Sequence, residues 1–209
     1  MANESNGDFK GRRWHAALYD FLTKGDQKWI SGHRGHIMGE ADGRVLEIGA
    51  GTGQSFSHYE RAREVVATEP DPFMLGRAQR RLEELGLANV HLKQCAAEDL
   101  PFEDESFDHA VSVLVLCTVK DLRRALTEVR RVLKPGGTLR FIEHVRYDDG
   151  VRGRVQDAIA PVWRYLGGGC RLNRRTEETI SEAGFEFVDL TRHKMAVPGP
   201  VLVGVARRI

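Results

Sequence analysis

A short glycine-rich segment follows directly on an apolar run near residue 45. Val45, Leu46 and Ile48 form the run, and glycines then stand at alternate positions 49, 51 and 53. This pattern predicts a buried strand that enters a tight loop and then a helix over Gln54–Arg61, because glycines turn sharply and allow a ligand close to the main chain. The start of such a helix offers free N–H groups to an anionic ligand. The segment therefore predicts a ligand-binding α/β fold.

The rest of the chain repeats this alternation of strands and helices. Helices of ten or more residues between strands indicate parallel pairing with right-handed crossovers. Only residues 195–200 separate the last two strands, which predicts an antiparallel C-terminal hairpin. We expect strands over Arg44–Ile48, Glu64–Thr68, Val90–Gln94, His109–Leu116, Thr138–His144, Phe185–Thr191 and Val201–Ala206, and further helices over Pro72–Leu85 and Asp121–Leu133. The prediction is an α/β fold with a doubly wound, mostly parallel seven-stranded sheet.

Length predicts a single domain over residues 1–209, with a core at 44–145 and a hairpin at 185–206. Two segments stand outside the alternation. Residues 8–39 predict an N-terminal helical lid, and residues 151–175 an insertion on the acceptor side, since additions at the carboxyl ends of strands cover the ligand crevice. Within the insertion, the apolar residues from Val151 to Leu166 form a stripe that we expect to be core or pocket wall. The arginines of the same segment suit a solvated face or contact with anionic lipid.

Composition excludes several classes of protein. Lys plus Arg is 31 and Asp plus Glu is 30, so no overall charge favours nucleic acid. No segment reaches the length of a transmembrane helix, and the N-terminus lacks an apolar signal, which predicts a cytoplasmic protein. The three cysteines include no C-x-x-C pair, and His33 and His36 lack acidic or thiol partners in the sequence nearby, so we expect no metal.

Two carboxylates frame the glycine loop in the predicted fold. A dinucleotide fingerprint would need glycine at position 54, which is Gln54. Glu47, at the end of the strand, disfavours a pyrophosphate and suits an ammonium or sulfonium group. Glu69 ends the next strand about 20 residues on, where ribose hydroxyls bind in such folds. Pro70 and Met74 follow it, and Met74 and Phe73 are placed to cover an adenine face; a polar turn at Ala97 and Glu98 is placed to hold its edge.

In this order and spacing the motifs resemble the class I S-adenosylmethionine-dependent methyltransferases with a type 11 methyltransferase domain, over roughly Arg44 to Val145. The resemblance implies a Rossmann-like fold, S-adenosyl-L-methionine as cofactor and S-adenosyl-L-homocysteine as product. Ala96 stands where many relatives carry Asp, so Glu98 or backbone would hold the adenine amino group. The cofactor contacts implied are Glu47, Gly49, Ala50, Gly51, Gly53, Glu69, Pro70, Met74, Ala97, Glu98 and Leu114.

A finer likeness links the chain to the methyltransferase-like seven group, whose members are implied to be membrane-anchored alkyl thiol S-methyltransferases. Its residues are Val115–Asp121, Phe141–Val145, Pro161–Trp163 and Gly169–Arg174. The acceptor is then a small molecule, with a thiol as one candidate, although the N-terminal anchor of that group is not seen here.

The alternatives are phospholipid N-methylation, which would suit a lipid-like acceptor and peripheral membrane contact, quinone C-methylation, a non-catalytic cofactor-binding regulator, and a dinucleotide oxidoreductase. The preferred catalytic helpers are His144, at the end of the fifth strand, and Tyr19, in the lid. Further candidates are Cys117, Glu143, His15 and His33. The sequence does not indicate an oligomeric state.

Overall fold

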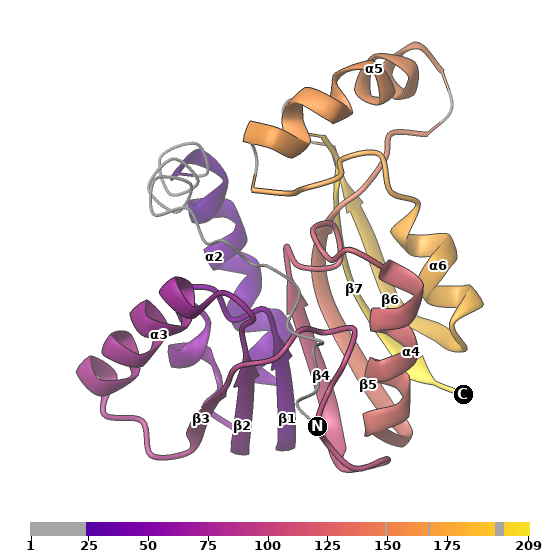
Figure 1. The fold of residues 1–209 in the computed structure, drawn as a ribbon. Helices are drawn as coiled ribbons and strands as arrows, with labels where there is room; N and C mark the ends of the chain where they lie inside the picture. Colours follow the sequence, from indigo (N-terminus) through magenta and orange to yellow (C-terminus); the bar gives the residue numbers. More distant parts are fainter. Residues whose placement is uncertain (1–23, 149, 167, 195–198) are drawn as a thin grey trace, which may run out of the picture.

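The computed structural model describes residues 24–148, 150–166, 168–194 and 199–209. They form one seven-stranded sheet of order β3-β2-β1-β4-β5-β7-β6 (Figure 1). The strands are β1 (Gly43–Ile48), β2 (Ala62–Thr68), β3 (Val90–Lys93), β4 (Phe107–Val113), β5 (Leu133–His144), β6 (Phe185–His193) and β7 (Val201–Arg208).

Parallel pairing covers the first five strands, and β7 runs antiparallel between β5 and β6. This confirms the predicted α/β fold, including the antiparallel C-terminal hairpin. At the carboxyl end of the sheet, Val201 of β7 pairs with both His144 and His193. The last residues of β5 and β6 therefore lie at the same edge as the loops that follow β1, β2 and β4.

Alternation of side chains along the strands builds a separate core on each face of the sheet. Val45 belongs to a cluster with α2 (Lys24–Gly39) and α3 (Pro72–Leu85). Its neighbour Leu46 belongs to the opposite cluster, with α4 (Leu122–Val132) and α6 (Thr176–Glu182). The strands are thus buried on both faces, as in a doubly wound sheet.

Local signals in the sequence fix the ends of α3 and α4. Asp71 accepts hydrogen bonds from the N–H groups of Phe73 and Met74, and Gly86 ends α3 in the left-handed conformation. Asp121 accepts from the N–H of Arg124 at the start of α4. Both helices match the sequence prediction within one residue at each end.

Helix α2 contains the described part of the predicted lid. Its buried residues Ile30, Ile37 and Met38 pack on the sheet, so this part is anchored in the core. Near its N-terminal end, the Trp29 and His33 rings contact His193 at the carboxyl end of β6.

Three predicted elements differ from the structure, and one of them, the fifth strand, begins at Leu133 instead of Thr138. The helix expected over Gln54–Arg61 is a short 3-10 turn, η1 (Phe56–His58). Three glycines with positive φ occupy positions 49, 51 and 53, and β2 already begins at Ala62, which leaves too few residues for a longer helix. The fourth strand ends at Val113 instead of Leu116, because Leu114 adopts φ 59° and the chain turns there.

Helix α5 (Val151–Leu166) lies beyond the carboxyl end of the sheet (Figure 1). Its apolar stripe, predicted to be core or pocket wall, is exposed: Val151 is 76% exposed and Val162 is 64% exposed. The helix instead buries a narrow face of Gln156 and Ala160. Within the described ranges no helix combines the length and apolar character needed to cross a membrane.

Candidate functional site

The glycine loop after β1 provides an open approach to the main chain at one position. A Cβ at Gly49 would lie 2.5 Å from the Val115 side chain, and one at Gly53 would lie 2.4 Å from the Phe56 ring. A Cβ at Gly51 would meet nothing within 4 Å, although its φ is +58°. The backbone at Gly49 and Gly53 thus packs directly against neighbouring side chains, whereas Gly51 faces space that a ligand can fill.

Glu69 connects the end of β2 to this loop. Its Oε2 accepts from Gly51 N at 2.9 Å, and its Oε1 accepts from Asp71 N at 2.9 Å. Burial raises the pKa of Glu69, and the two backbone N–H donors oppose that effect. Each carboxylate oxygen keeps a second lone pair, so Glu69 retains the capacity to accept from two adjacent hydroxyls.

Glu47 is a buried carboxylate beside the same loop. It is 2% exposed, and its Oε2 has no hydrogen-bond partner in the described part of the chain. Burial raises its pKa to about 7, while the nearby hydroxyls of Ser55 and Tyr59 and the charge of Arg34 oppose the shift. An unpartnered buried acceptor is costly, and a cationic group on a ligand would satisfy it.

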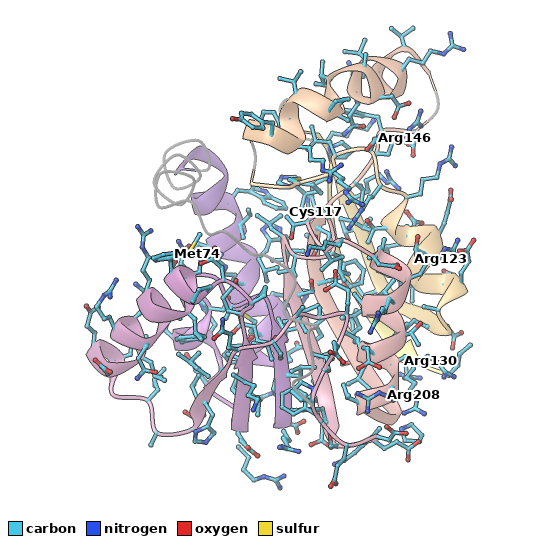
Figure 2. All side chains as sticks on the ribbon, viewed as in Figure 1. Met74, Cys117, Arg123, Arg130, Arg146 and Arg208 are labelled. Atoms are coloured by element: carbon cyan, nitrogen blue, oxygen red, sulfur yellow. The ribbon has the colours of Figure 1, made fainter. Side chains whose placement is uncertain are left out.

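The segment after β2 places Pro70 and Met74 next to Glu69. The Asp71 cap holds the start of α3, where Met74 is half-buried and Phe73 is 52% exposed. Figure 2 labels Met74 on α3. The exposed ring of Phe73 and the flexible thioether of Met74 lie close to Glu69 in the sequence and offer apolar surface on which a flat ring can pack.

The loop after β3 brings Ala97 and Glu98 toward α4. Ala97 is buried, whereas the Glu98 carboxylate uses Oε1 to accept from Lys120 N at 2.7 Å. Arg124 Nε donates to the backbone oxygen of Glu98 at 2.7 Å. Glu98 therefore connects the loop to the start of α4. A contact between its carboxylate and an adenine would be made by Oε2.

Leu114 begins the turn after β4. Its φ of 59° is uncommon for a residue with a branched side chain, and such conformations gather at functional sites. The turn is held by Leu114 N, which donates to Ile142 O at 2.8 Å, and by Glu143.

Glu143 is fully buried and acts as an acceptor for this turn. Its Oε1 accepts from Ser112 Oγ at 2.6 Å and from the N–H groups of Val115 and Leu116 at 2.9 Å each. Its Oε2 accepts from Cys117 N at 3.1 Å. Burial raises the pKa of Glu143 against these donors. The Glu143 carboxylate therefore positions the turn after β4. The sequence shows only that Glu143 lies near the end of a strand, which does not indicate this role.

His144 lies in a buried group with Cys117 and Cys170. Its Nδ1 is 3.8 Å from Cys170 Sγ, and its Nε2 has no partner among the described residues. A hydrogen bond from the thiol of Cys117 lowers the pKa of Cys170 to about 5, with further contributions from His144 and Trp163. The same contact raises the pKa of Cys117. Sequence analysis missed this group, because its members are far apart in the chain.

The remaining predicted residues give a mixed outcome. Tyr19 lies outside the described residues. His33 stacks on Trp29 with ring centroids 3.9 Å apart, and its Nδ1 is 3.0 Å from Trp29 O, so its ring is part of an aromatic cluster.

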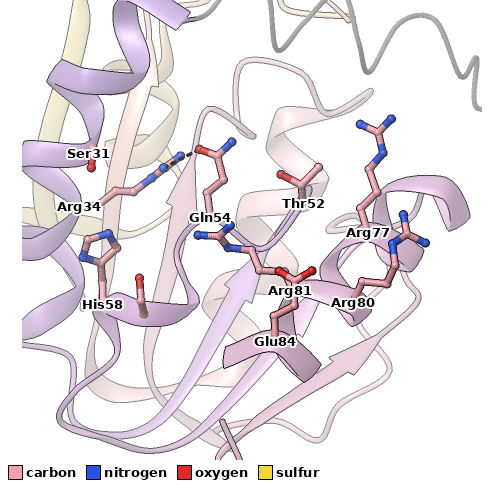
Figure 3. Close-up of a pocket in the computed structure, with 10 residues that line it drawn as sticks. Ser31, Arg34, Thr52, Gln54, His58, Arg77, Arg80, Arg81 and Glu84 are labelled. Atoms are coloured by element: carbon pink, nitrogen blue, oxygen red, sulfur yellow. Dashed lines mark hydrogen bonds between the residues drawn. The ribbon is translucent and has the colours of Figure 1, made fainter. Parts of the chain in front are cut away.

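A cleft of about 870 Å³ lies between α2, η1 and α3. Figure 3 shows Arg34 donating to Gln54 on one side and arginines of α3 on the other. The lining is Ser31, Arg34, Thr52, Gln54, Ser57, His58, Arg77, Arg80, Arg81 and Glu84. Glu47, Glu69 and Leu114 do not line it, so the loop geometry, and not this basic cleft, locates the predicted ligand site.

The arrangement fits one kind of ligand. Glu47 offers an unsatisfied acceptor to a cation, Gly51 leaves space at the main chain, and Glu69 offers acceptors to hydroxyls. A molecule that carries an ammonium group and a ribose matches these features at the carboxyl ends of β1 and β2, and the apolar surface of Phe73 and Met74 suits a flat base on the same molecule.

Comparison with known proteins agrees with this fit. Residues 46–141 match the methyltransferase domain family. Over 173 residues the chain is 35% identical to the thiol S-methyltransferase TMT1B of Rattus norvegicus, covering 78% of this chain and 69% of that protein. It is 33% identical over 161 residues to the phosphatidylethanolamine N-methyltransferase of Cereibacter sphaeroides, covering 75% of this chain and 76% of the relative.

A solved structure with the same fold is geranyl diphosphate methyltransferase in complex with SAM. It superposes with a TM-score of 0.69 at 16% identity and covers 98% of this chain and 94% of its own. At that identity the likeness concerns the fold, and it extends to the ends of the described sheet.

Proposed function

Because this chain belongs to the S-adenosylmethionine-dependent methyltransferases, we propose that it methylates the sulfur of a small thiol acceptor. The methyltransferase activity follows from the family. The choice of sulfur draws on the 35% identity to a thiol S-methyltransferase. A thiol suits an enzyme of this type, since its ordinary pKa near 8.5 leaves part of it ionised at neutral pH.

The structural observation that carries the proposal is the pair of buried carboxylates around the glycine loop. We assign the ammonium of the cofactor to Glu47, whose Oε2 lacks a partner, and the ribose hydroxyls to Glu69. Bound there, S-adenosyl-L-methionine supplies an electrophilic methyl group on a sulfonium centre. We place the other cofactor contacts at Gly49, Ala50, Gly51, Gly53, Pro70, Met74, Ala97, Glu98 and Leu114.

The protein's contribution is to hold the two reactants and to exclude water. Glu143 fixes the turn at Leu114 through four hydrogen bonds, so the main chain beside the proposed methyl position is rigid. His144 is the proposed catalytic helper, and its buried ring faces Cys170. Tyr19 remains a proposed contributor from the lid.

A panel of acceptors tests the proposal. Radiolabelled S-adenosylmethionine is incubated with the full chain and with mercaptoethanol, a phenol or phosphatidylethanolamine vesicles. The proposal expects label on the thiol product and its loss in Glu47→Gln. Glu60→Gln, an exposed carboxylate near the same loop, is the matched control and should retain activity. Label on the amine or phenol alone would refute sulfur as the target.

A lipid-like acceptor is the second candidate, favoured by the exposed face of α5. Val155 is 54% exposed and Ile159 is 44% exposed, and both belong to an apolar stripe that Arg152 and Arg154 accompany on the same helix. Such a helix can lie in the interface of an anionic membrane. The phosphatidylethanolamine N-methyltransferase relative acts, by its name, on a lipid.

Sedimentation with vesicles that contain an anionic phospholipid tests this second candidate. The wild type should sediment with them, and Ile159→Asp should remain in the supernatant. Val188→Asp, at an exposed apolar residue of β6, is the control and should sediment as the wild type does. Equal behaviour of all three proteins would exclude α5 as a membrane contact.

A further inference from the structure

Three metal-ligating side chains from separate segments meet beside the carboxyl end of the sheet. Cys117 comes from the turn after β4, His144 from the end of β5, and Cys170 from the loop between α5 and α6. Their ligand atoms all lie within 4.8 Å of one another. The residues are 0%, 5% and 5% exposed, respectively. Figure 2 labels Cys117 at this end of the sheet, below α5.

The backbone around the three residues is fixed by hydrogen bonds. Arg171 N donates to Cys117 O at 2.8 Å, and Cys117 N donates to Glu143 Oε2 at 3.1 Å. The guanidinium of Arg174 donates to the carbonyl oxygens of Leu116 and Val119. The loop that carries Cys170 is therefore clamped to the turn that carries Cys117, and the group is held in place before any ligand arrives.

We propose that Cys117, His144 and Cys170 bind a thiophilic divalent metal ion, of which Zn²⁺ is the chemical type. Thiolate sulfur and imidazole nitrogen are the ligands that zinc prefers. Tetrahedral zinc with bond lengths of about 2.0 to 2.3 Å sets its ligand atoms about 3.5 to 3.8 Å apart. The distance of 3.8 Å from His144 Nδ1 to Cys170 Sγ is about 0.3 Å longer than the roughly 3.5 Å of a zinc-bound nitrogen–sulfur pair, a difference that a small side-chain movement closes.

The surroundings suit two thiolates around a divalent cation. The Trp163 side chain packs against Cys117 and Cys170, where its indole N–H suits the role of an outer partner to a metal-bound sulfur. Arg174 lies close enough to Glu143 to offset that carboxylate. Two thiolates then balance one divalent ion, and the pocket has no net charge.

A disulfide between the two cysteines is the competing structure. It would use two of the three converging atoms and leave the buried His144 ring without a partner. A metal ion uses all three, which is why the geometry favours it.

The site also bears on the acceptor, in a step that rests on the proposed thiol specificity. Catalytic zinc sites have three protein ligands and keep the fourth position for water or substrate. Leu114 packs against this cluster, so the site adjoins a proposed cofactor contact. A thiol that took the fourth position would bind as a thiolate and leave its proton with water as it entered the site. The resulting sulfur lone pair forms the new S–CH₃ bond as the sulfonium C–S bond breaks, with no change in oxidation state of the metal.

Metal content of the purified full chain tests the site directly. After desalting from medium with zinc, mass spectrometry should find about one zinc per chain, as three dedicated ligands imply. Cys117→Ser and Cys170→Ser should each lose most of it. Cys95→Ser, at the third free cysteine and outside the group, should keep it. Cobalt substitution should add sulfur-to-cobalt charge-transfer absorption, absent in Cys170→Ser.

Other outcomes overturn the inference. Folded wild type, shown by its binding of S-adenosylmethionine, that takes up no zinc would refute the site. A mass lower by two hydrogens with two titratable thiols lost would establish the disulfide instead. If metal-stripped enzyme methylates thiols at an unchanged rate, the catalytic step is wrong although the proposed function stands. If the metal binds and thiols are not methylated, the thiol proposal fails and the metal site stands.

Discussion

Glu69 and Gly51 are joined by a hydrogen bond of 2.9 Å from the glycine N–H to the carboxylate Oε2. The bond ties the end of β2 to the loop after β1, although the two residues are 18 positions apart. One carboxylate thus shapes the loop and presents acceptors to a ligand. Its loss should affect both the loop and cofactor affinity.

Glu69→Ala should therefore weaken S-adenosylmethionine binding by about 10- to 100-fold, because hydrogen bonds to a charged group contribute roughly 1.5 to 3 kcal/mol each. Calorimetric titration measures the affinity. Glu64→Ala, which removes a half-buried salt bridge between β2 and Arg44 of β1, is the control and should leave affinity unchanged. Equal affinity of wild type and Glu69→Ala would remove Glu69 from the cofactor site.

The pKa of Glu47, raised by burial to about 7, predicts pH-dependent stability and binding. Between its ordinary value of 4.5 and about 7 the folded chain holds a proton that the unfolded chain releases. The contribution to stability is therefore full below 4.5 and decreases as pH rises to 7, by roughly 3 kcal/mol in total. Glu47→Gln should flatten this part of the profile in denaturant unfolding at several pH values.

Cofactor affinity should change in the opposite direction with pH. The ammonium of the cofactor pairs with ionised Glu47, so affinity should rise as pH increases through 7. In Glu47→Gln the affinity should be lower and independent of pH over this range. A wild-type affinity that falls over the same interval would contradict the assignment of the ammonium to Glu47.

Gly51→Ala and Gly53→Ala should separate binding from stability. Both glycines have positive φ, which costs an alanine about 1 kcal/mol. At Gly51 the new methyl meets nothing within 4 Å, so the variant should fold well and lose cofactor affinity. At Gly53 the methyl would lie 2.4 Å from the Phe56 ring, so thermal unfolding should show a much larger loss of stability. The reverse order would place the ligand elsewhere.

Local signals explain which elements the sequence predicts well. Asp71, Pro72 and Gly86 each have a conformational reason to begin or end α3, and the helix has those bounds. The glycine loop and Glu69 were predicted together because strand ends of a parallel sheet share one edge. The bounds of α3 follow from residues adjacent in the chain, and the meeting of the strand ends follows from the alternation of strands and helices.

Long-range packing explains what the sequence did not predict. Cys117, His144 and Cys170 are separated by 27 and 26 positions, and only the packing of two loops against the end of β5 brings them together. In α5, periodicity predicts an apolar stripe but not the face that packs. The small residues Gly153 and Ala160 pack toward the protein, and the larger apolar side chains lie outside.

Glu143→Gln tests whether a buried carboxylate maintains the turn after β4. The carboxylate of Glu143 accepts four hydrogen bonds through its two oxygens, whereas a neutral amide has only one oxygen. At least one of the four N–H and O–H donors therefore loses its partner in the variant. Each buried donor left unsatisfied costs about 1 to 3 kcal/mol. Thermal unfolding should show that loss, whereas Glu186→Gln on the exposed face of β6 should not. Because Cys117 N is one of the donors, zinc retention should fall together with stability; a stable variant with full zinc content would show that Glu143 has no positioning role.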